Sequence, residues 1–250
     1  MDLSLLKYDA NPDAVINPFR DEGYHLPARM AFTILHNDEI NAFAAAHNGE
    51  QLAVFETVSA NFPVYAVTIA GERIGLCRCP LGAPAATQLL EFLIAYGARQ
   101  IIAVGSCGVL TNQLENKMLV VQSALRDEGT SFHYLPAADV IRLDAKFAAR
   151  IQASLATQHI ASEPVNTWTT DAFFRETRVQ VQDRLQRGFT VVEMECAALA
   201  ACAEFRGVQF GQIFFTGDSL ADVDNHNPRD FGTASHNIAL EMTTTCLATL

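Results

Sequence analysis

The sequence predicts an α/β fold, with a central mixed and twisted β-sheet flanked by helices on both faces of a single domain. Two observations support this. Half of the 250 residues are hydrophobic, which is enough for one large core and does not require two domains. Short apolar runs that suit buried strands also alternate with segments of helical length and periodicity. This alternation is typical of a parallel or mixed sheet covered by helices.

Residues 1–28 are expected to form an irregular arm that packs on a neighbour, and residues 29–250 to form the domain. The arm is rich in Pro, Asp and Asn and follows neither the helical nor the strand period. After it, the apolar patterns predict strands at 29–35, 65–69, 73–79 and 100–104, with a helix at 84–96 between the last two. They then predict strands at 118–123 and 208–216 and helices at 144–158, 195–206 and 229–250.

Composition and charge argue against several kinds of partner. The formal net charge is −11, from 28 acidic and 17 basic residues, and it would repel a nucleic-acid backbone. The sequence has neither a signal peptide pattern nor an apolar run long enough for a membrane span, so we expect a cytoplasmic protein. Its six cysteines lack zinc-site spacing and are expected to be buried free thiols, with no metal bound.

Glycines flank a hydroxyl where one buried strand is predicted to end, at Gly105-Ser106-Cys107-Gly108. Backbone amides in such a turn can cradle an anion, with Ser106 as a further donor. An ordinary tight turn would use the same residues, so both interpretations stay open. The spacing differs from the Gly-x-Ser-x-Gly nucleophile elbow, which argues against a serine hydrolase.

Two acids, Glu193 and Glu195, interrupt an otherwise apolar passage. A helix start explains one acid, because a carboxylate in the first turn favours the helix dipole, but it does not readily explain both. A carboxylate in a cleft can accept both hydroxyls of a vicinal diol, and a neighbouring thioether supplies an adaptable apolar wall. Met194 and Glu195 are therefore candidates for binding a sugar.

A third polar position, Asp218, ends the aromatic strand Ile213-Phe214-Phe215. An aspartate at the carboxyl end of a buried strand can have a raised pKa and act as a general acid. An Asx turn after the strand is an equally good explanation of the residue by itself. The coincidence of three polar strand ends is more informative than any one of them.

These segments resemble the nucleoside phosphorylase and uridine phosphorylase superfamily, which includes bacterial-type purine nucleoside phosphorylases and methylthioadenosine nucleosidases. Gly82-Ala83-Pro84 and residues 101–108 look like the family's phosphate-side segment, and residues 192–198 look like its ribose motif. The separation of Asp218 from Glu195 is similar to that between the catalytic aspartate and the ribose-binding glutamate of purine-specific members. The resemblance covers residues from about 60 to 220.

The resemblance implies a pentosyltransferase that cleaves a purine nucleoside with phosphate, giving the free base and ribose 1-phosphate. Phosphate is then a co-substrate, and no cofactor or metal is expected. Asp218 would protonate N7 of the base, helped by Arg229. The other implied roles are phosphate binding by Ser106, Gly105 and Arg126, ribose binding by Met194, Glu195 and His25, and base binding by Phe173 and Arg175.

The chain departs from the family pattern at two phosphate-binding charges. Residues 35–40 stand where phosphorylases carry a Gly-Asp-Pro-x-x-Arg loop, and Ala103 stands where they carry an arginine. Each charge-assisted contact would contribute about 1.5 to 3 kcal/mol, so other cations would have to substitute. The candidates are Arg78, Arg126, His133 and Arg175.

Several alternatives stay open at this point. Nucleosidases of the superfamily use water and an activating glutamate in the first loop, where Glu39 is the candidate. Residues 125–134 look closer to the uridine branch, so uridine phosphorylase is another alternative. A nucleoside-binding protein that has lost turnover is a third. A dinucleotide-binding fold is disfavoured because no Gly-x-Gly-x-x-Gly turn is present.

The resemblance also implies a homo-oligomer, either a dimer or a trimer of dimers. In such assemblies a histidine or arginine of one subunit completes the neighbouring subunit's site. His25, in the N-terminal arm, is the candidate for that contact.

Overall fold

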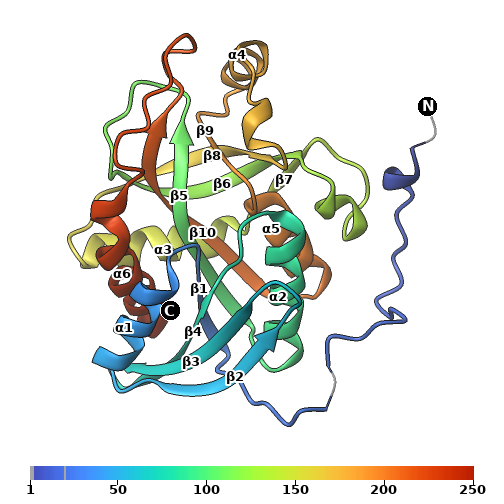
Figure 1. The fold of residues 1–250 in the computed structure, drawn as a ribbon, viewed down its shortest axis with the longest axis vertical. Helices are drawn as coiled ribbons and strands as arrows, with labels where there is room; N and C mark the ends of the chain where they lie inside the picture. The colour runs from blue at the N-terminus through green and yellow to red at the C-terminus, as the bar shows by residue number, and fades with distance from the viewer. Residues whose placement is uncertain (1–2, 20) are drawn as a thin grey trace.

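A mixed β-sheet runs through the whole molecule in the computed structural model, which describes residues 3–19 and 21–250 (Figure 1). The N-terminal residues 1, 2 and 20 of the expected arm lie outside the described residues. Within the described chain the strands are β1 (Arg29–Thr33), β2 (Glu50–Glu56), β3 (Asn61–Ile69), β4 (Glu72–Arg78), β5 (Gln100–Val109), β6 (Met118–Asp127), β7 (Val140–Arg142), β8 (Ser162–Thr170), β9 (Val191–Glu193) and β10 (Gln209–Ser219).

The strand order is β10-β6-β8-β9-β5-β1-β4-β3-β2, with β7 paired to β6. Because β10 pairs with β5 as well as with β6, the strands β5, β9, β8, β6 and β10 close into a ring. Strands β1, β4, β5 and β10 are mutually parallel, so their carboxyl ends meet at the same edge. Open parallel sheets bind ligands at this edge.

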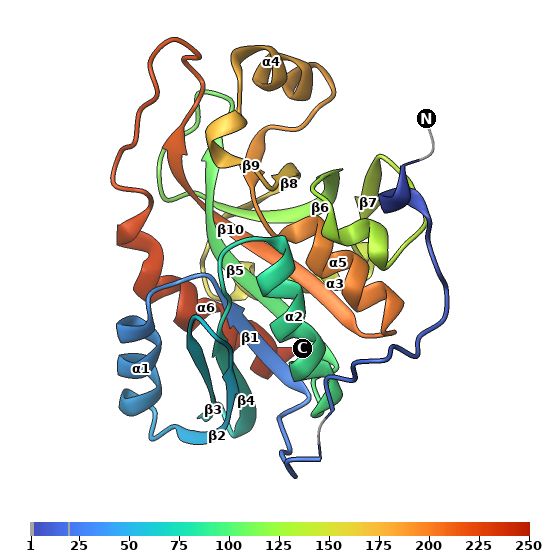
Figure 2. The same cartoon turned by 45° about the vertical axis from the view of Figure 1, so that its right-hand side comes forward.

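Helices cover both faces of the sheet, as the sequence predicts (Figure 2). Helices α2 (Ala83–Ala95) and α5 (Cys196–Phe205) pack on one face, in a core that includes Leu89, Leu93 and Leu199. Helices α1 (Asn37–Ala46), α3 (Ala145–Thr157) and α6 (His236–Thr249) pack on the other, in a core that includes Phe43, Ile151 and Leu240. The short α4 (Arg178–Gln186) lies near the edge where β5 and β10 end.

The last helix is shorter than predicted, because it begins at His236 and not at residue 229. Arg229, Phe231 and Gly232 all have backbone φ angles between 49° and 74°, in the left-handed region that no right-handed helix contains. The segment before His236 is thus a loop that folds back over the end of β10, where Asn227 and Ser219 form an isolated bridge.

The glycine-flanked run at 105–108 is strand and not the expected turn. Strand β5 continues to Val109, because Gly105, Ser106 and Cys107 pair with Phe214, Phe215 and Thr216 of β10, and Gly108 pairs with Val192 of β9. Glycine has a packing reason at 105, since a Cβ atom there would lie 2.9 Å from the Cβ atom of Ile34. Pairing on both sides keeps this run extended.

All six cysteines are buried and free. Within residues 3–19 and 21–250, none of the helices has the length and apolar character that a membrane span requires.

Candidate active site

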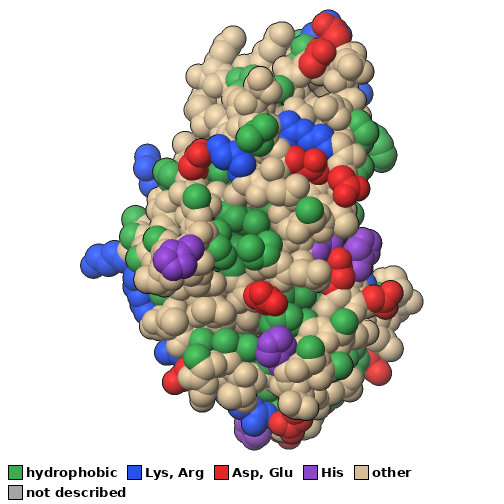
Figure 3. Space-filling view, turned by 90° about the vertical axis from the view of Figure 1, so that its left-hand side faces the viewer, with side chains coloured by type: hydrophobic (Ala, Val, Ile, Leu, Met, Phe, Trp, Pro, Cys, Tyr) green, Lys and Arg blue, Asp and Glu red, His purple; other side chains and the backbone are tan. Residues whose placement is uncertain are grey.

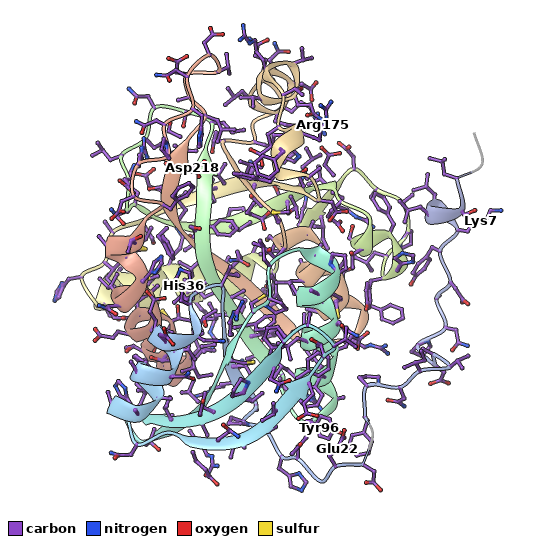
Figure 4. All side chains as sticks on the ribbon, viewed as in Figure 1. Lys7, Glu22, His36, Tyr96, Arg175 and Asp218 are labelled. Atoms are coloured by element: carbon purple, nitrogen blue, oxygen red, sulfur yellow. The ribbon has the colours of Figure 1, made fainter. Side chains whose placement is uncertain are left out.

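A cavity of about 800 Å³ opens where the parallel strands end. It brings together residues that lie far apart in the sequence. Ile34 follows β1, Ser106 lies in β5, Met194 and Glu195 follow β9, and Asp218 lies in β10. The residues between β8 and α4 add Phe173, Arg175 and Glu176. Figure 4 places Asp218 and Arg175 in the same upper part of the molecule, where β5 and β10 end.

Glu193 is held entirely by the protein. Its Oε1 atom accepts hydrogen bonds from the hydroxyls of Thr167 (3.2 Å) and Thr169 (2.5 Å). Its Oε2 atom accepts from the backbone N–H groups of Glu195 and Cys196, both at 2.7 Å. These two amides begin α5, so Glu193 caps that helix and has no free oxygen for a ligand.

Glu195 is held by backbone amides next to the cavity. Oε1 accepts from the backbone N–H of Gly82 at 2.5 Å. Gly82 has φ = 91°, a left-handed conformation that glycine adopts readily and that aims this amide at Glu195. The side chain is only 4% exposed, and burial together with the charge of Glu193 raises the pKa of Glu195. Glu195 is therefore oriented toward the cavity by the turn that precedes α2.

Asp218 pairs with His226, which the sequence analysis did not single out. The Nε2 atom of His226 lies 2.8 Å from Oδ2 of Asp218. The aspartate side chain is 9% exposed and the imidazole 47%. Gly108 of β5 leaves room for this arrangement, because a Cβ atom there would lie 3.2 Å from Oδ1 of Asp218. His226 lies in a polar loop whose sequence has neither helical nor strand periodicity, so no local pattern predicts it as a site residue.

The residues after β8 form one wall of the cavity. Phe173, Phe174 and Arg175 lie in a short 3-10 turn, and the two phenyl rings meet edge to face at 5.1 Å. Phe173 is 42% exposed although it is a large apolar side chain. Burial, and then the nearby charge of Asp218, raise the pKa of Glu176 to about 8. Glu176 therefore keeps its proton to higher pH than an ordinary glutamate, and its protonated form can donate a hydrogen bond.

Ser106 is exposed to the cavity between buried neighbours. Phe215, which pairs with Ser106 across β5 and β10, packs against His236, with the two ring centroids 5.4 Å apart. His236 in turn pairs through Nδ1 with Oε1 of Glu39 at 2.7 Å. The other oxygen of Glu39 accepts from the backbone N–H of His36 at 3.0 Å and caps α1. A histidine and carboxylate pair therefore packs beside Phe215, and neither member of the pair lines the cavity.

Comparison with known proteins places this geometry in a family. The sequence profile described as the phosphorylase superfamily matches residues 33–250. The chain belongs to the phosphorylase superfamily.

Named relatives of this phosphorylase-superfamily chain act on different nucleosides. It is 29% identical to a guanosine phosphorylase from Halorubrum lacusprofundi, over 63% of this chain and 69% of the relative. It is 26% identical to a DeoD-type purine nucleoside phosphorylase from Dichelobacter nodosus, over 70% and 73%. The crystal structure of uridine phosphorylase from Vibrio fischeri superposes with a TM-score of 0.76 at 23% identity, covering 90% of this chain and 93% of that one. The structural likeness shows a common fold.

Two arginines expected at the site of this superfamily member are engaged elsewhere. The guanidinium group of Arg126 donates to Ser131 Oγ at 2.9 Å and to the carbonyls of Pro136 and Leu135 at 2.7 and 3.2 Å. It does not line the cavity. Arg229 donates to the carbonyls of Gly217 at 3.1 Å and Gln113 at 2.5 Å, so it fixes the backbone next to Asp218 and not its carboxylate.

Of the other candidate cations, only Arg175 reaches the cavity that Ser106 lines. Arg175 lines the cavity, on the same turn as Phe173. Neither Arg78 nor His133 lines it, and His133 instead borders a separate cavity beneath the N-terminal arm. His25 is exposed in that arm and is not part of the same subunit's cavity.

Figure 3 shows the face that carries α6, with apolar side chains gathered near its centre and charged ones above them.

Proposed function

We propose that this chain cleaves the N-glycosidic bond of a purine nucleoside and transfers the ribosyl group to phosphate. The observation that carries the proposal is the meeting of Glu195 and Asp218 in one cavity. One of these carboxyl groups is oriented by a backbone amide and the other is paired with a histidine. A sugar-binding carboxylate and a proton donor are the two groups that this cleavage needs.

In the proposed reaction, Glu195 accepts hydrogen bonds from the ribose hydroxyls while Met194 packs on the sugar. Asp218 gives a proton to N7 of the base, and the bond between N9 and C1′ breaks, so the base leaves as a neutral molecule. Positive charge that develops at C1′ is stabilised by the phosphate anion, whose oxygen then bonds to C1′. The products are the free base and ribose 1-phosphate, and Asp218 regains a proton from solvent.

The wall after β8 supports a role in base binding. Phe173 offers an aromatic surface for stacking, and the protonated Glu176 can donate to an acceptor on the base. Asp218 favours a purine over a uracil, because N7 is a basic ring nitrogen that uracil lacks. Uridine phosphorolysis stays an alternative, and uridine is therefore one of the substrates in the base-release assay below.

Hydrolysis is a second candidate, favoured by the charges near Ser106. Among the described residues that line the cavity, the one basic side chain is Arg175, which belongs to the wall after β8. A phosphate dianion beside Ser106 would therefore have Arg175 as its one counter-charge among these residues, or would need a cation from outside them. The pair of Glu39 and His236, which packs beside Phe215, is the candidate for orienting a water molecule in that reaction.

A homo-oligomer is part of the proposal, with His25 of a neighbouring subunit reaching the ribose. Light scattering measures the assembly, and His25→Ala tests the contact. A monomeric active enzyme would exclude it.

Base release from inosine, adenosine, guanosine, uridine and methylthioadenosine, with and without phosphate, tests the proposed reaction by chromatography. Release that needs phosphate supports phosphorolysis, and release without it supports hydrolysis. Asp218→Asn should lower turnover at least about tenfold to a thousandfold, whereas Glu163→Gln, on the exposed side of β8, should not. Binding without any product would favour a nucleoside-binding protein and overturn the proposal.

A further inference from the structure

A second, smaller chamber of about 270 Å³ adjoins the main cavity beyond Asp218. The two spaces share Phe173, Phe174, Glu176 and Asp218 as common walls. A nucleoside whose base reaches Asp218 in the main cavity therefore faces the opening of this chamber.

The chamber lies on the side of Asp218 away from the candidate sugar site. Ser106, Met194 and Glu195 line the main cavity, and none of them lines the chamber. Two ring carbons of a purine can carry a group beside N7, namely C8 and C6. A group on C8 lies next to N9 and so points back along the sugar. A group on C6 lies beside N7 and points away from C1′, which is the direction of the chamber.

The chamber wall is largely apolar. Val181 of α4, which is 2% exposed, and Leu220 and Val223 of the loop after β10 form much of it, and all three belong to one apolar cluster. The polar groups are Glu176, the pair of Asp218 and His226, and at the outer end Arg178 and Asp222. At about 30 Å³ per water molecule, the space equals about nine waters, which is room for a group of five to seven carbon atoms.

An apolar group that displaced this water would gain binding free energy in proportion to the surface it buries. An unsubstituted adenine or hypoxanthine would leave the chamber filled with solvent. We propose that the preferred substrate is a purine nucleoside with an apolar substituent on its C6 amino group, and that Leu220, Val223 and Val181 select it. This inference rests on the proposed cleavage of purine nucleosides and adds the substrate class.

The test compares kcat/KM for N6-benzyladenosine with that for adenosine, and uses 8-benzylaminoadenosine as the positional control. The wild-type protein should favour the N6-benzyl compound by at least about tenfold and should disfavour the 8-substituted one. Val223→Phe and Leu220→Phe, which fill the chamber, should each remove that preference while adenosine cleavage changes less than about threefold. Val179→Phe, on the exposed part of α4 outside the chamber, should leave the preference intact.

Binding gives a readout that does not depend on turnover. Calorimetry should show that free 6-benzylaminopurine binds at least about tenfold more tightly than adenine to the wild-type protein, and that Val223→Phe abolishes the difference. Equal binding of the two bases, or slower cleavage of N6-benzyladenosine than of adenosine, would overturn the inference and leave the proposed function standing. Tight binding of both bases with no cleavage of any nucleoside would overturn the proposed function instead.

Discussion

His226 and Asp218 form a hydrogen bond of 2.8 Å across the turn that follows β10. The bond joins a largely buried carboxylate to a half-exposed imidazole, so the histidine connects the proton donor of the proposed reaction with solvent. It holds Oδ2 of Asp218, while Oδ1 faces Gly108 of β5.

Replacing His226 should impair the proposed proton transfer more than binding. We expect His226→Ala to lower kcat by about tenfold to a hundredfold, with a smaller change in KM, because Asp218 loses its orienting partner and its route to solvent. Steady-state kinetics with inosine measures this. His159→Ala, at an isolated surface turn, is the matched control. An unchanged kcat in His226→Ala would show that the pair has no part in turnover.

Arg229 should act on the backbone. Its guanidinium group joins the carbonyls of Gly217 and Gln113, which are far apart in the chain. Arg229→Ala should lower the free energy of unfolding by about 1 to 3 kcal/mol, because two partly buried carbonyls lose a charged donor. Denaturant unfolding measures this directly. If stability stays the same and only the turnover falls, Arg229 assists Asp218 as the family resemblance implies.

Substitutions at Glu193 and Glu195 should have different effects, the first on folding stability and the second on ligand binding and turnover. Glu193→Gln replaces one of two acceptor oxygens with an amide donor that faces N–H or O–H groups, and should cost about 1 to 3 kcal/mol of folding free energy. Glu195→Gln keeps an acceptor for Gly82 and should change stability little while lowering turnover at least tenfold. Thermal and denaturant unfolding, paired with kinetics, distinguishes the two. If instead Glu193→Gln lowers turnover and Glu195→Gln lowers stability, the sugar binds at Glu193.

Glu176 should make stability depend on pH. Its pKa is raised in the folded protein from 4.5 to about 8, so the folded state binds this proton more tightly than the unfolded state. The stabilisation of the folded state by this proton is fully present below about pH 4.5 and is lost as pH rises through 8. Glu176→Gln should therefore gain stability relative to the wild type when pH is raised from 5 to 9. Parallel unfolding curves at every pH in that interval would contradict the raised pKa.

The α/β class followed from the sequence alone, and the structure and the comparisons confirm it. Apolar periodicity is a local property, so the alternation of strands and helices is visible without tertiary contacts. The sequence also predicted that Ser106, Glu195 and Asp218 would stand where strands end, because polar residues stand out at the end of apolar runs. Ser106 and Asp218 instead lie within β5 and β10, which run further than predicted. Parallel strands bring such ends to one edge, and these three residues do line one cavity.

Only the tertiary structure decided which partner each of these side chains has. The sequence predicts Glu195 over Glu193 as the sugar ligand without a physical reason for the choice, and the structure supplies one. Glu193 caps α5 and is bound by threonines of β8, whereas Glu195 meets an amide that precedes α2. The sequence did not indicate His226, since a loop of irregular backbone brings that ring back to β10. Arg126 likewise meets loop carbonyls that no period predicts. Contacts of this kind depend on the path of the chain between distant segments, whereas the fold class depends on the local pattern of burial.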